Sequence, residues 1–385
     1  MKNKISNGVD MAEPAKRYSS LKYTLSILDT FYQVILLLLF LGSGLSKILA
    51  VGLLKFTPAP KILVRGFTPN YYFIVPLYIL IVSIVYYLLD FPINFYHSYI
   101  LEHRFHLSEQ KIKDWFKDQI KAGIIFYIIA LILIAAFYYI LKHFIHSWWI
   151  AISLFWIFFS LILAKLTPVV IIPLFFKYKR LSDENLRERI MNLANKMKVR
   201  ILDCFEIDLS KKTLKANAAF VGWGATRRVI LSDTLKDKYS YDEIEVILAH
   251  EFSHYRLKHL LKLILVNSSV IIMSFYLIFR TSSSTLSLFG LSSLSDIAAL
   301  PLVLIYFVLL GIIMQPFENY ISRRLERNAD IEALKITGLK DAFISMMGKL
   351  SVQNLADRNP HPIIKFFFFD HPPIDERIAL ARRPL

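Results

Sequence analysis

Six long apolar stretches without a charged residue constrain the fold of this chain more than any other feature. They cover residues 30–46, 70–89, 122–141, 147–164, 263–279 and 297–317. Each is close to the roughly 20 residues that a helix needs to cross the hydrocarbon core of a bilayer. A soluble protein can bury one such helix, but six would require an implausibly large apolar core. We therefore expect an α-helical membrane protein with six spans, whose partner is the lipid bilayer.

The composition agrees with this prediction, since 55% of the residues are hydrophobic and only 20% are charged. This balance is too apolar for an ordinary soluble enzyme. The first and fifth spans are the least regular, because the first contains Gly42 and Gly44 and the fifth contains the polar residues 267–269. The N-terminal residues are mostly polar and do not resemble a signal peptide, so we expect the first span to remain in the mature protein.

Lysine and arginine are unevenly distributed around the spans. If the N-terminus is inside the cell, the later outside loops carry only Lys142 and Arg280, whereas the inside segments are rich in both residue types. This asymmetry predicts that both termini and the polar segments face the cytoplasm. Attraction to anionic lipid headgroups explains the net charge of +16. No basic stripe with interleaved aromatic residues accompanies it, so we expect no nucleic-acid partner.

The spans divide the chain into five parts. These are a cytoplasmic N-terminal segment (1–25), four spans with their loops (26–176), a polar segment (177–259), two further spans (260–317) and a polar tail (318–385). The two halves of the candidate active site described below fall in the polar segment and in the polar tail. They would therefore be joined across the last pair of spans.

The polar segment contains patterns typical of both helices and strands. Residues 183–197 are predicted as an amphipathic helix, 201–207 as a strand, and 218–221 with 229–231 as a hairpin around Gly222-Trp223-Gly224. An exposed strand can bind an extended peptide by main-chain hydrogen bonds. Cys204 is the only cysteine, and we expect a reduced, packed thiol.

The sequence His250-Glu251-Phe252-Ser253-His254 is the strongest chemical motif in the chain. On a helix, residues four apart lie on one face, so both imidazoles can reach one metal ion while Glu251 faces the water on that metal. A capping box at Ser240 and Glu243, followed by apolar residues at helical spacing, predicts that the motif does lie on a helix.

Glu326 and Asp330 lie one helical turn apart in the polar tail and complete the predicted site. Glu326 would join His250 and His254 as the third protein ligand of one zinc ion, which leaves the fourth position for water. The pKa of that water falls to roughly 7, which makes it a nucleophile at neutral pH. Glu251 would be the general base, and Asp330 is placed to accept the free ring N–H of a ligating histidine.

Further motifs are spread along the chain. They are Leu101-Glu102-His103-Arg104-Phe105 with Gln110, Pro168 with Pro173-Leu174-Phe175 and Lys177, Asn217-Ala218-Ala219, residues 229–235, and Asp370-His371-Pro372-Pro373 with Arg377. With the metal motifs, they make the chain resemble the type I CAAX prenyl proteases, which are integral-membrane zinc endopeptidases of the gluzincin kind. The resemblance extends from about Lys16 to Arg382.

The resemblance implies zinc ligation by the two histidines and Glu326, with Glu251 activating the water. It implies that His371 and Arg377 approach the scissile carbonyl, where the developing oxyanion must be stabilised. Asn217 and Ala218 would lie beside the bound peptide backbone. The implied fold is a ring of transmembrane helices enclosing a water-filled chamber, capped by a mainly helical zinc-peptidase domain that carries a small β-sheet.

The chain departs from the family pattern in three respects. Eukaryotic members have seven spans where six are expected here, Ala219 replaces an aromatic residue, and His106-Leu107-Ser108 replaces Gly-Phe-Asn. We expect these changes to affect how a substrate fits the site, but not the zinc-dependent hydrolysis itself. His103 and His106 are not expected to bind a second metal, because no acidic or cysteine partner is suitably spaced. Residues 366–369 are expected to pack or to contact the membrane surface.

The leading functional prediction is a zinc endopeptidase that removes the C-terminal tripeptide from prenylated CAAX proteins, or cleaves other peptide or protein substrates with the same machinery. The alternative is an HtpX-like quality-control protease for membrane proteins, which would have fewer spans before the zinc motif and no counterpart of the motifs near Glu102 and Pro173. A more distant alternative is a non-enzymatic transporter or scaffold. That function predicts polar or charged residues deep inside the spans, whereas the acidic and histidine residues cluster on the polar segments.

Overall fold

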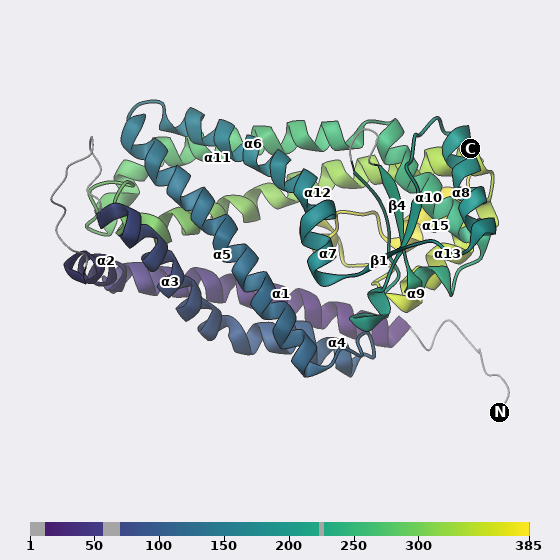
Figure 1. The fold of residues 1–385 in the computed structure, drawn as a ribbon, viewed down its shortest axis with the longest axis horizontal. Coiled ribbons are helices and arrows are strands. Elements are labelled where there is room, and N and C mark those ends of the chain that lie inside the picture. Colours follow the sequence, from purple (N-terminus) through teal and green to yellow (C-terminus); the bar gives the residue numbers. More distant parts are fainter. Residues whose placement is uncertain (1–11, 57–69, 223–226, 385) are drawn as a thin grey trace.

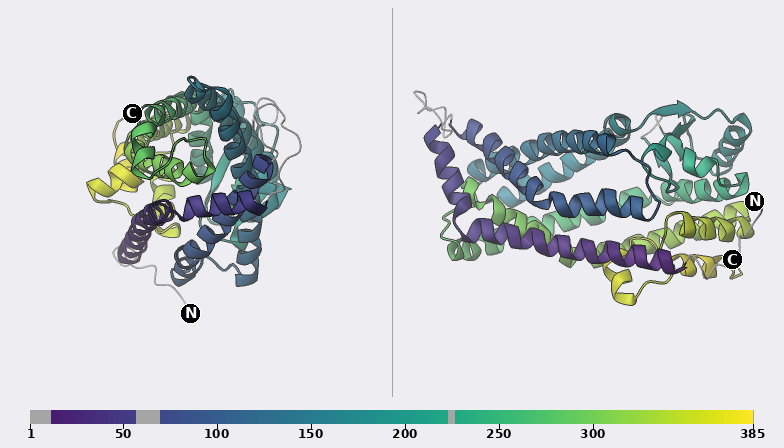
Figure 2. Two further views of the ribbon diagram at one scale, coloured as in Figure 1. Left: turned by 90° about the vertical axis from the view of Figure 1, so that its left-hand side faces the viewer. Right: turned by 90° about the horizontal axis from the view of Figure 1, so that it is seen from below.

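The structure, a computed structural model, describes residues 12–56, 70–222 and 227–384. Long helices form one end of the molecule, and short helices and strands form the other end (Figure 1). Seen along the long axis, the long helices surround a common centre instead of forming a flat layer (Figure 2). The predicted architecture, a ring of membrane helices with a mainly helical domain and a small sheet, is confirmed.

In the described part of the chain, six helices are long and apolar enough to cross a membrane, as predicted. They consist mainly of α1 (Ala12–Gly42), α3 (Asn70–Phe95), α5 (Ile112–His143), α6 (Trp148–Leu166), α11 (His259–Leu288) and α12 (Leu300–Thr337). Large apolar side chains such as Phe31, Leu39 and Phe73 are exposed on them. Such a surface is stable only when lipid covers it.

Two of these helices continue through π-helical turns toward the domain of short helices. α3 passes through the turn Tyr96–Ile100 into α4 (Leu101–Arg104). α6 passes through the turn Thr167–Ile171 into α7 (Ile172–Phe175). The motifs around Glu102 and Pro173 therefore lie at the end of the helix bundle that adjoins the domain (Figure 1).

The first span differs from its predicted bounds of 30–46. α1 begins at Ala12 and ends at Gly42, and Gly44 adopts a φ of +75° where the chain turns into α2 (Leu45–Phe56). Only glycine reaches this backbone region without steric cost, so the apolar stretch is broken there. In contrast, α11 continues through the polar residues 267–269. The hydroxyl of Ser269 is satisfied within the helix, since its Oγ donates to the carbonyl oxygen of Leu265 at 2.9 Å.

Two carboxylates lie within the membrane helices, beside the ends of the predicted apolar stretches. Asp29 belongs to α1 and Asp90 to α3, and one oxygen of each is buried. Gln33 Nε2 donates to Asp29 Oδ2 at 2.9 Å. The predicted apolar stretches themselves carry no acidic residue, but the helices extend beyond them and so include these two carboxylates. Acidic groups in membrane helices face the bundle interior or water, which agrees with one buried oxygen on each of these carboxylates.

The polar segment forms a four-stranded sheet from the residues that the structure describes. The strands are β1 (Tyr178–Arg180), β2 (Cys204–Ile207), β3 (Ala218–Val221) and β4 (Arg228–Ser232), in the order β1-β2-β4-β3. β3 and β4 pair antiparallel, which confirms the predicted hairpin, although Trp223 and Gly224 of its turn lie outside the described residues. The strand predicted at 201–207 is shorter, because residues 201–203 precede the ladder with β4, which begins at Cys204.

Short helices surround this sheet and complete the domain. α8 (Glu184–Lys196) confirms the predicted amphipathic helix and is capped by Asp183. The others are α9 (Asp233–Lys236), α10 (Tyr241–Arg256), α13 (Lys340–Gln353), α14 (Pro362–Phe368) and α15 (Ile374–Ala381), with 3₁₀ turns at Leu209–Lys211 and Ile297–Ala299. Their core includes the buried, free thiol of Cys204. Burial raises the pKa of this thiol to about 12, so it is a packed and unreactive side chain, as expected.

α12 connects the two ends of the molecule. The predicted sixth span and the predicted start of the polar tail form one helix, Leu300–Thr337. It contacts α1 and α11 among the long helices and α10, α14 and α15 in the domain. Pro316 lies inside it, where the apolar stretch ends. A residue of this helix can therefore be fixed both by the membrane and by the domain.

Candidate metal centre

The candidate site begins with the way in which α10 is anchored. Ser240 caps the helix, and its side chain and that of Glu243 form the predicted capping box. Glu243 also accepts hydrogen bonds from Ser345 Oγ at 2.7 Å and Lys349 Nζ at 2.6 Å of α13. Burial alone raises the pKa of the Glu243 carboxyl, but these hydrogen bonds outweigh it and lower the pKa below its ordinary value. The start of α10 is thus fixed to its neighbours.

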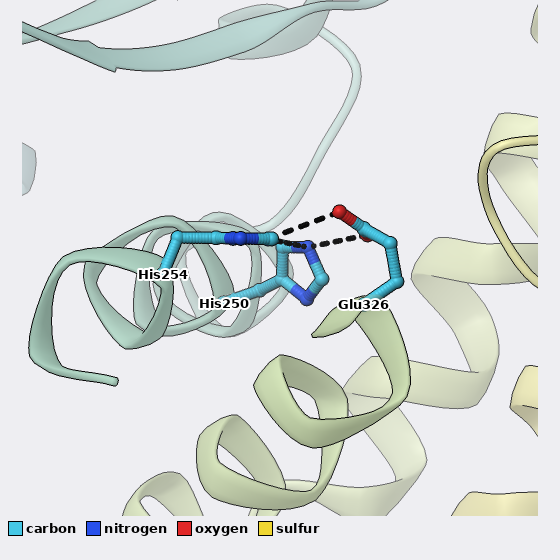
Figure 3. Close-up of side chains that lie close together, drawn as sticks. All are labelled: His250, His254 and Glu326. Carbon is cyan, nitrogen blue, oxygen red and sulfur yellow. Dashed lines mark hydrogen bonds and ion pairs between the residues drawn. The ribbon is translucent and has the colours of Figure 1, made fainter. Parts of the chain in front are cut away.

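His250 and His254 project from α10 toward Glu326 of α12 (Figure 3). His250 Nε2 lies 3.1 Å from Glu326 Oε2, and His254 Nε2 lies 3.2 Å from Glu326 Oε1. The two Nε2 atoms are 3.1 Å apart. In the described residues, this is the group of histidine, cysteine and acidic side chains whose spacing could hold a metal ion.

This spacing fits a tetrahedral metal. Ligand atoms at about 2.0 Å from a tetrahedral zinc ion lie about 3.3 Å from one another. The three distances among His250, His254 and Glu326, between 3.1 and 3.2 Å, are close to that value. Two imidazole nitrogens and a carboxylate are also a ligand set that suits zinc. The residues present can therefore hold the predicted ion.

Asp330 orients the first histidine from the side opposite the ligand atoms. Its Oδ1 lies 2.9 Å from His250 Nδ1, a position that favours a hydrogen on Nδ1 of the neutral ring and leaves Nε2 to bind a metal. Arg377 donates from Nε to Asp330 Oδ2 at 2.8 Å and from Nη2 to Asp330 Oδ1 at 2.6 Å. Arg377 therefore contacts the metal-binding residues through Asp330, and its implied approach to the scissile carbonyl stays a prediction.

Glu251 lies on α10 between the two histidines in the sequence. Burial raises the pKa of its carboxyl above the ordinary value, and the nearby Glu326 carboxylate acts in the same direction. A carboxylate with a raised pKa is a stronger base near neutral pH. This environment suits the predicted role of Glu251 in accepting a proton from water.

His371 lies at the open edge of the site. Its Nε2 is 3.3 Å from Glu326 Oε2, and its Nδ1 is 2.8 Å from Asp370 Oδ1. Burial alone lowers the pKa of His371, but the carboxylates of Asp370 and Glu326 outweigh it and raise the pKa. The side chain is half exposed, so a protonated imidazole can donate to a group that enters from solvent.

The predicted substrate strand lies beside the metal helix. Asn217 directly precedes β3, and its N–H donates to Ser232 Oγ at 3.0 Å while its carbonyl accepts from the Ser232 N–H at 3.0 Å. The ring of Phe220 in β3 packs against Phe252 of α10, with ring centres 5.2 Å apart. β3 is the outer strand of the described sheet, so its other edge is open to an extended peptide.

The structure also reveals a contact that fixes this strand, which the sequence did not indicate. Lys215 Nζ donates to Glu102 Oε2 at 2.8 Å and to Tyr18 Oη at 2.9 Å. The Leu214 N–H donates to the carbonyl oxygen of Leu107 at 2.8 Å. Glu102 and Leu107 follow the second span, so the segment before Asn217 is held by the membrane part.

His259 is a second residue that sequence reasoning missed. Its Nδ1 lies 3.1 Å from His254 Nδ1, and its side chain is buried. If His254 donates from Nδ1 to His259, its Nε2 is free to bind a metal. The contact of Asp330 with His250 Nδ1 leaves Nε2 of His250 free in the same way. The only available signal was a histidine five residues after the motif, at the start of α11.

Two other predictions concern residues away from the site. Both ring nitrogens of His103 lie within 3.0 Å of backbone carbonyl oxygens, those of Tyr99 and Gln110, so the ring has no nitrogen available for a second metal.

In the segment 366–369, the ring of Phe368 packs on Tyr23 of α1 while Phe366 remains exposed. The packing expected for this segment is thus observed at Phe368, and contact of Phe366 with the membrane surface stays a prediction.

Comparison with known proteins identifies the family. A model described as the CAAX prenyl protease N-terminal region with five membrane helices matches residues 9–177, and a model of peptidase family M48 matches residues 180–385. The chain belongs to peptidase family M48. As an M48 protein with six apolar helices, it is an integral-membrane metalloprotease, which excludes the non-enzymatic transporter or scaffold.

Curated relatives and a solved structure resemble most of the chain. The uncharacterized metalloprotease YhfN of Bacillus subtilis is 30% identical over 373 residues, which is 96% of this chain and 85% of that protein. CAAX prenyl protease 1 of Saccharomyces cerevisiae is 28% identical over 312 residues, 76% of this chain and 68% of the relative. The crystal structure of S. mikatae Ste24p has the same fold, with a TM-score of 0.85 and 24% identity over 97% of this chain and 89% of that one.

Proposed function

We propose that this protein is a zinc endopeptidase that cleaves an extended peptide bound along β3. The arrangement of His250, His254 and Glu326 around one point, with their ligand atoms 3.1 to 3.2 Å apart, carries this proposal. Zinc bound there would lower the pKa of a water molecule and polarise the scissile carbonyl. The open edge of β3 supports a peptide rather than a small molecule as the substrate.

The chain's own residues would then perform the proton transfers and hold the substrate. Glu251 accepts the proton of the attacking water and delivers it to the leaving amine. His371, whose protonated form Asp370 favours, donates to the carbonyl oxygen as negative charge develops on it. Asp330 and Arg377 keep His250 in its ligating orientation. Asn217 and Ala218 contact the peptide backbone at the start of β3.

The substrate we propose is the C-terminal CAAX sequence of a prenylated protein. Support comes from the match of residues 9–177 to the CAAX prenyl protease N-terminal region and from the CAAX prenyl proteases among the relatives. The HtpX-like alternative expects fewer spans before the metal motif, whereas four of the six long apolar helices in the described residues precede it. We further propose that the metal centre and both termini face the cytoplasm, on the basis of the lysine and arginine bias.

The proposal is tested with detergent-purified protein and a farnesylated CAAX peptide. Wild type and Glu251→Gln are compared for cleavage, and bound zinc is quantified in both. We expect equal zinc and cleavage by the wild type alone, with turnover of the variant reduced by at least a factor of about 100. Cleavage by the variant at the normal rate would refute the mechanism. Bound zinc without cleavage of this peptide would refute the proposed CAAX substrate, but it would not contradict the assignment of the protein as a metalloprotease.

A further inference from the structure

A basic cavity lies on the flank of α12 beside the metal centre. Its volume is about 400 Å³, and its walls come from α12, α14, α15 and the adjoining loops. Six cationic side chains face two carboxylates in this cavity. The cationic residues are Arg323, Arg324, Arg327, Lys365, Arg377 and Arg383, and the acidic residues are Asp330 and Glu376. Such an excess of positive charge favours an anionic ligand.

Three of these cationic side chains are already paired with other groups of the protein and form fixed parts of the cavity wall. Arg377 is held by Asp330, and Lys365 pairs with Glu376 at 2.5 Å. Arg323 donates to the backbone carbonyl oxygens of Lys365, at 3.1 Å, and Phe369, at 2.5 Å. These contacts use both carboxylates of the cavity, so neither is left to neutralise the remaining cations.

The other three cations are available to a ligand. Among the residues that the structure describes, Arg324, Arg327 and Arg383 have no carboxylate within 4.0 Å. All three are exposed, and Arg324 lies over the ring of Tyr320. Guanidinium groups present paired N–H donors that match the oxygens of a phosphate. A phosphate in the cavity would also relieve the repulsion among these like charges.

The edge of the cavity at Tyr320 lies at the depth of lipid headgroups. The apolar stretch of α12 ends at Phe317, and Tyr320 follows about 5 Å further along the helix. The guanidinium of Arg324 reaches back over the ring of Tyr320. The headgroup layer extends about 5–7 Å beyond the hydrocarbon on each side. Exposed apolar side chains, Phe317, Tyr320, Ile363 and Phe366, lie on the same helices, as is typical of residues at a membrane interface.

We propose that this cavity binds the phosphate of an anionic lipid headgroup. The arginines Arg324, Arg327 and Arg383 contact the phosphate oxygens, while the exposed apolar residues at the membrane interface contact the acyl chains. A free phosphate ion would use only the first of these two features, so the combination favours a lipid. The site is separate from the proposed zinc ligands but shares Asp330 and Arg377 as wall residues.

The experiment uses the full-length protein in phosphatidylcholine nanodiscs with increasing amounts of phosphatidylglycerol. Native mass spectrometry then measures the number and affinity of the phosphatidylglycerol molecules retained. The variant Arg324→Gln/Arg327→Gln/Arg383→Gln removes the three available cations. Each cation near an anionic lipid contributes about fivefold to affinity, so the tightest site should weaken on the order of 100-fold. The single variant Arg327→Gln should weaken it about fivefold and serves if the triple variant fails to fold.

The matched control is Arg104→Gln/Lys111→Gln/Lys113→Gln, which removes three exposed cations at the same end of the helix bundle. It should leave the tightest lipid site unchanged. An equal loss in the control, or no loss in the variants, would show that general surface charge binds the lipid and would overturn the proposal. A further arm adds inorganic phosphate alone. Displacement of phosphatidylglycerol by an equal concentration of inorganic phosphate would overturn the assignment to a lipid.

Discussion

Arg377 holds Asp330 in a two-point hydrogen-bonded pair, and Asp330 holds the ring of His250 from its other side. Asp330 and Arg377 are fully and largely buried, respectively. A chain of contacts thus runs from α15 through α12 to the metal helix α10. It makes the orientation of a candidate ligand depend on a residue close to the C-terminus of the chain.

Asp330→Asn should weaken metal binding, because an amide cannot replace both carboxylate contacts of Asp330. Loss of such a partner typically reduces metal affinity about 10- to 100-fold. Zinc affinity is measured by competition with a chelator of known affinity. Asp341→Asn makes the same change at an exposed position of α13 and should have no effect. Equal zinc affinity of Asp330→Asn and wild type would show that Asp330 does not orient the ligand.

His371→Ala should lower turnover about 100-fold, the usual cost of one donor to a developing oxyanion. Bound zinc should stay unchanged, because His371 is absent from the proposed ligand set. His371→Asn should recover part of the rate, since its amide can still donate. Single-turnover kinetics with zinc quantification measures both effects. A variant with normal turnover would exclude His371 from the reaction.

The stability of the protein should fall when Glu243 is protonated. Its pKa in the folded state is lower than the ordinary value of 4.5, so the carboxylate stabilises the fold above about pH 4.5 and this contribution disappears as the pH falls through the folded pKa. Glu243→Gln should lower stability by about 1–2 kcal/mol near pH 7 and make no difference in strong acid. Thermal unfolding across this pH range measures the effect, with the exposed Glu184→Gln as the control. Parallel pH profiles for Glu243→Gln and wild type would contradict the argument.

Lys215→Met should impair substrate binding more than the chemical step. It removes the contacts to Glu102 and Tyr18 that hold the segment before Asn217. We expect KM to rise roughly tenfold, the equivalent of about 1.4 kcal/mol, with a smaller change in kcat. Lys211→Met removes an ion pair with Asp208 on the same segment and is the matched control. A fall in kcat alone would show that Lys215 does not position the strand.

Much of the fold follows from local patterns in the sequence. The six apolar stretches predict the six membrane helices, and the capping box at Ser240 predicts the start of α10. The zinc motif and Glu326 meet as expected because both lie on helices whose faces are set by spacing. These features depend on residues close together in the chain or on a well-defined chemical requirement, so the sequence alone reveals them.

The features that sequence reasoning missed depend on contacts between distant segments. Nothing near Lys215 indicates that Glu102 is its partner, because 113 residues separate them. The acidic residues Asp29 and Asp90 end apolar stretches in the sequence, yet the helices continue past them because the bundle gives them an interior to face. The sequence also did not indicate that α12 continues past the end of the sixth apolar stretch, since a span normally ends where apolar residues give way to polar ones.

Pro316 separates two environments within α12 and leaves one backbone carbonyl of the helix without its usual donor. Glu326 lies ten residues beyond it, about 15 Å along the axis, so a bend of about 4° at Pro316 displaces the carboxylate by about 1 Å. Metal–ligand bonds tolerate only about 0.2 Å. A change in the bend of α12 at Pro316, imposed by the bilayer on one side of the proline, would therefore move a proposed metal ligand on the other side.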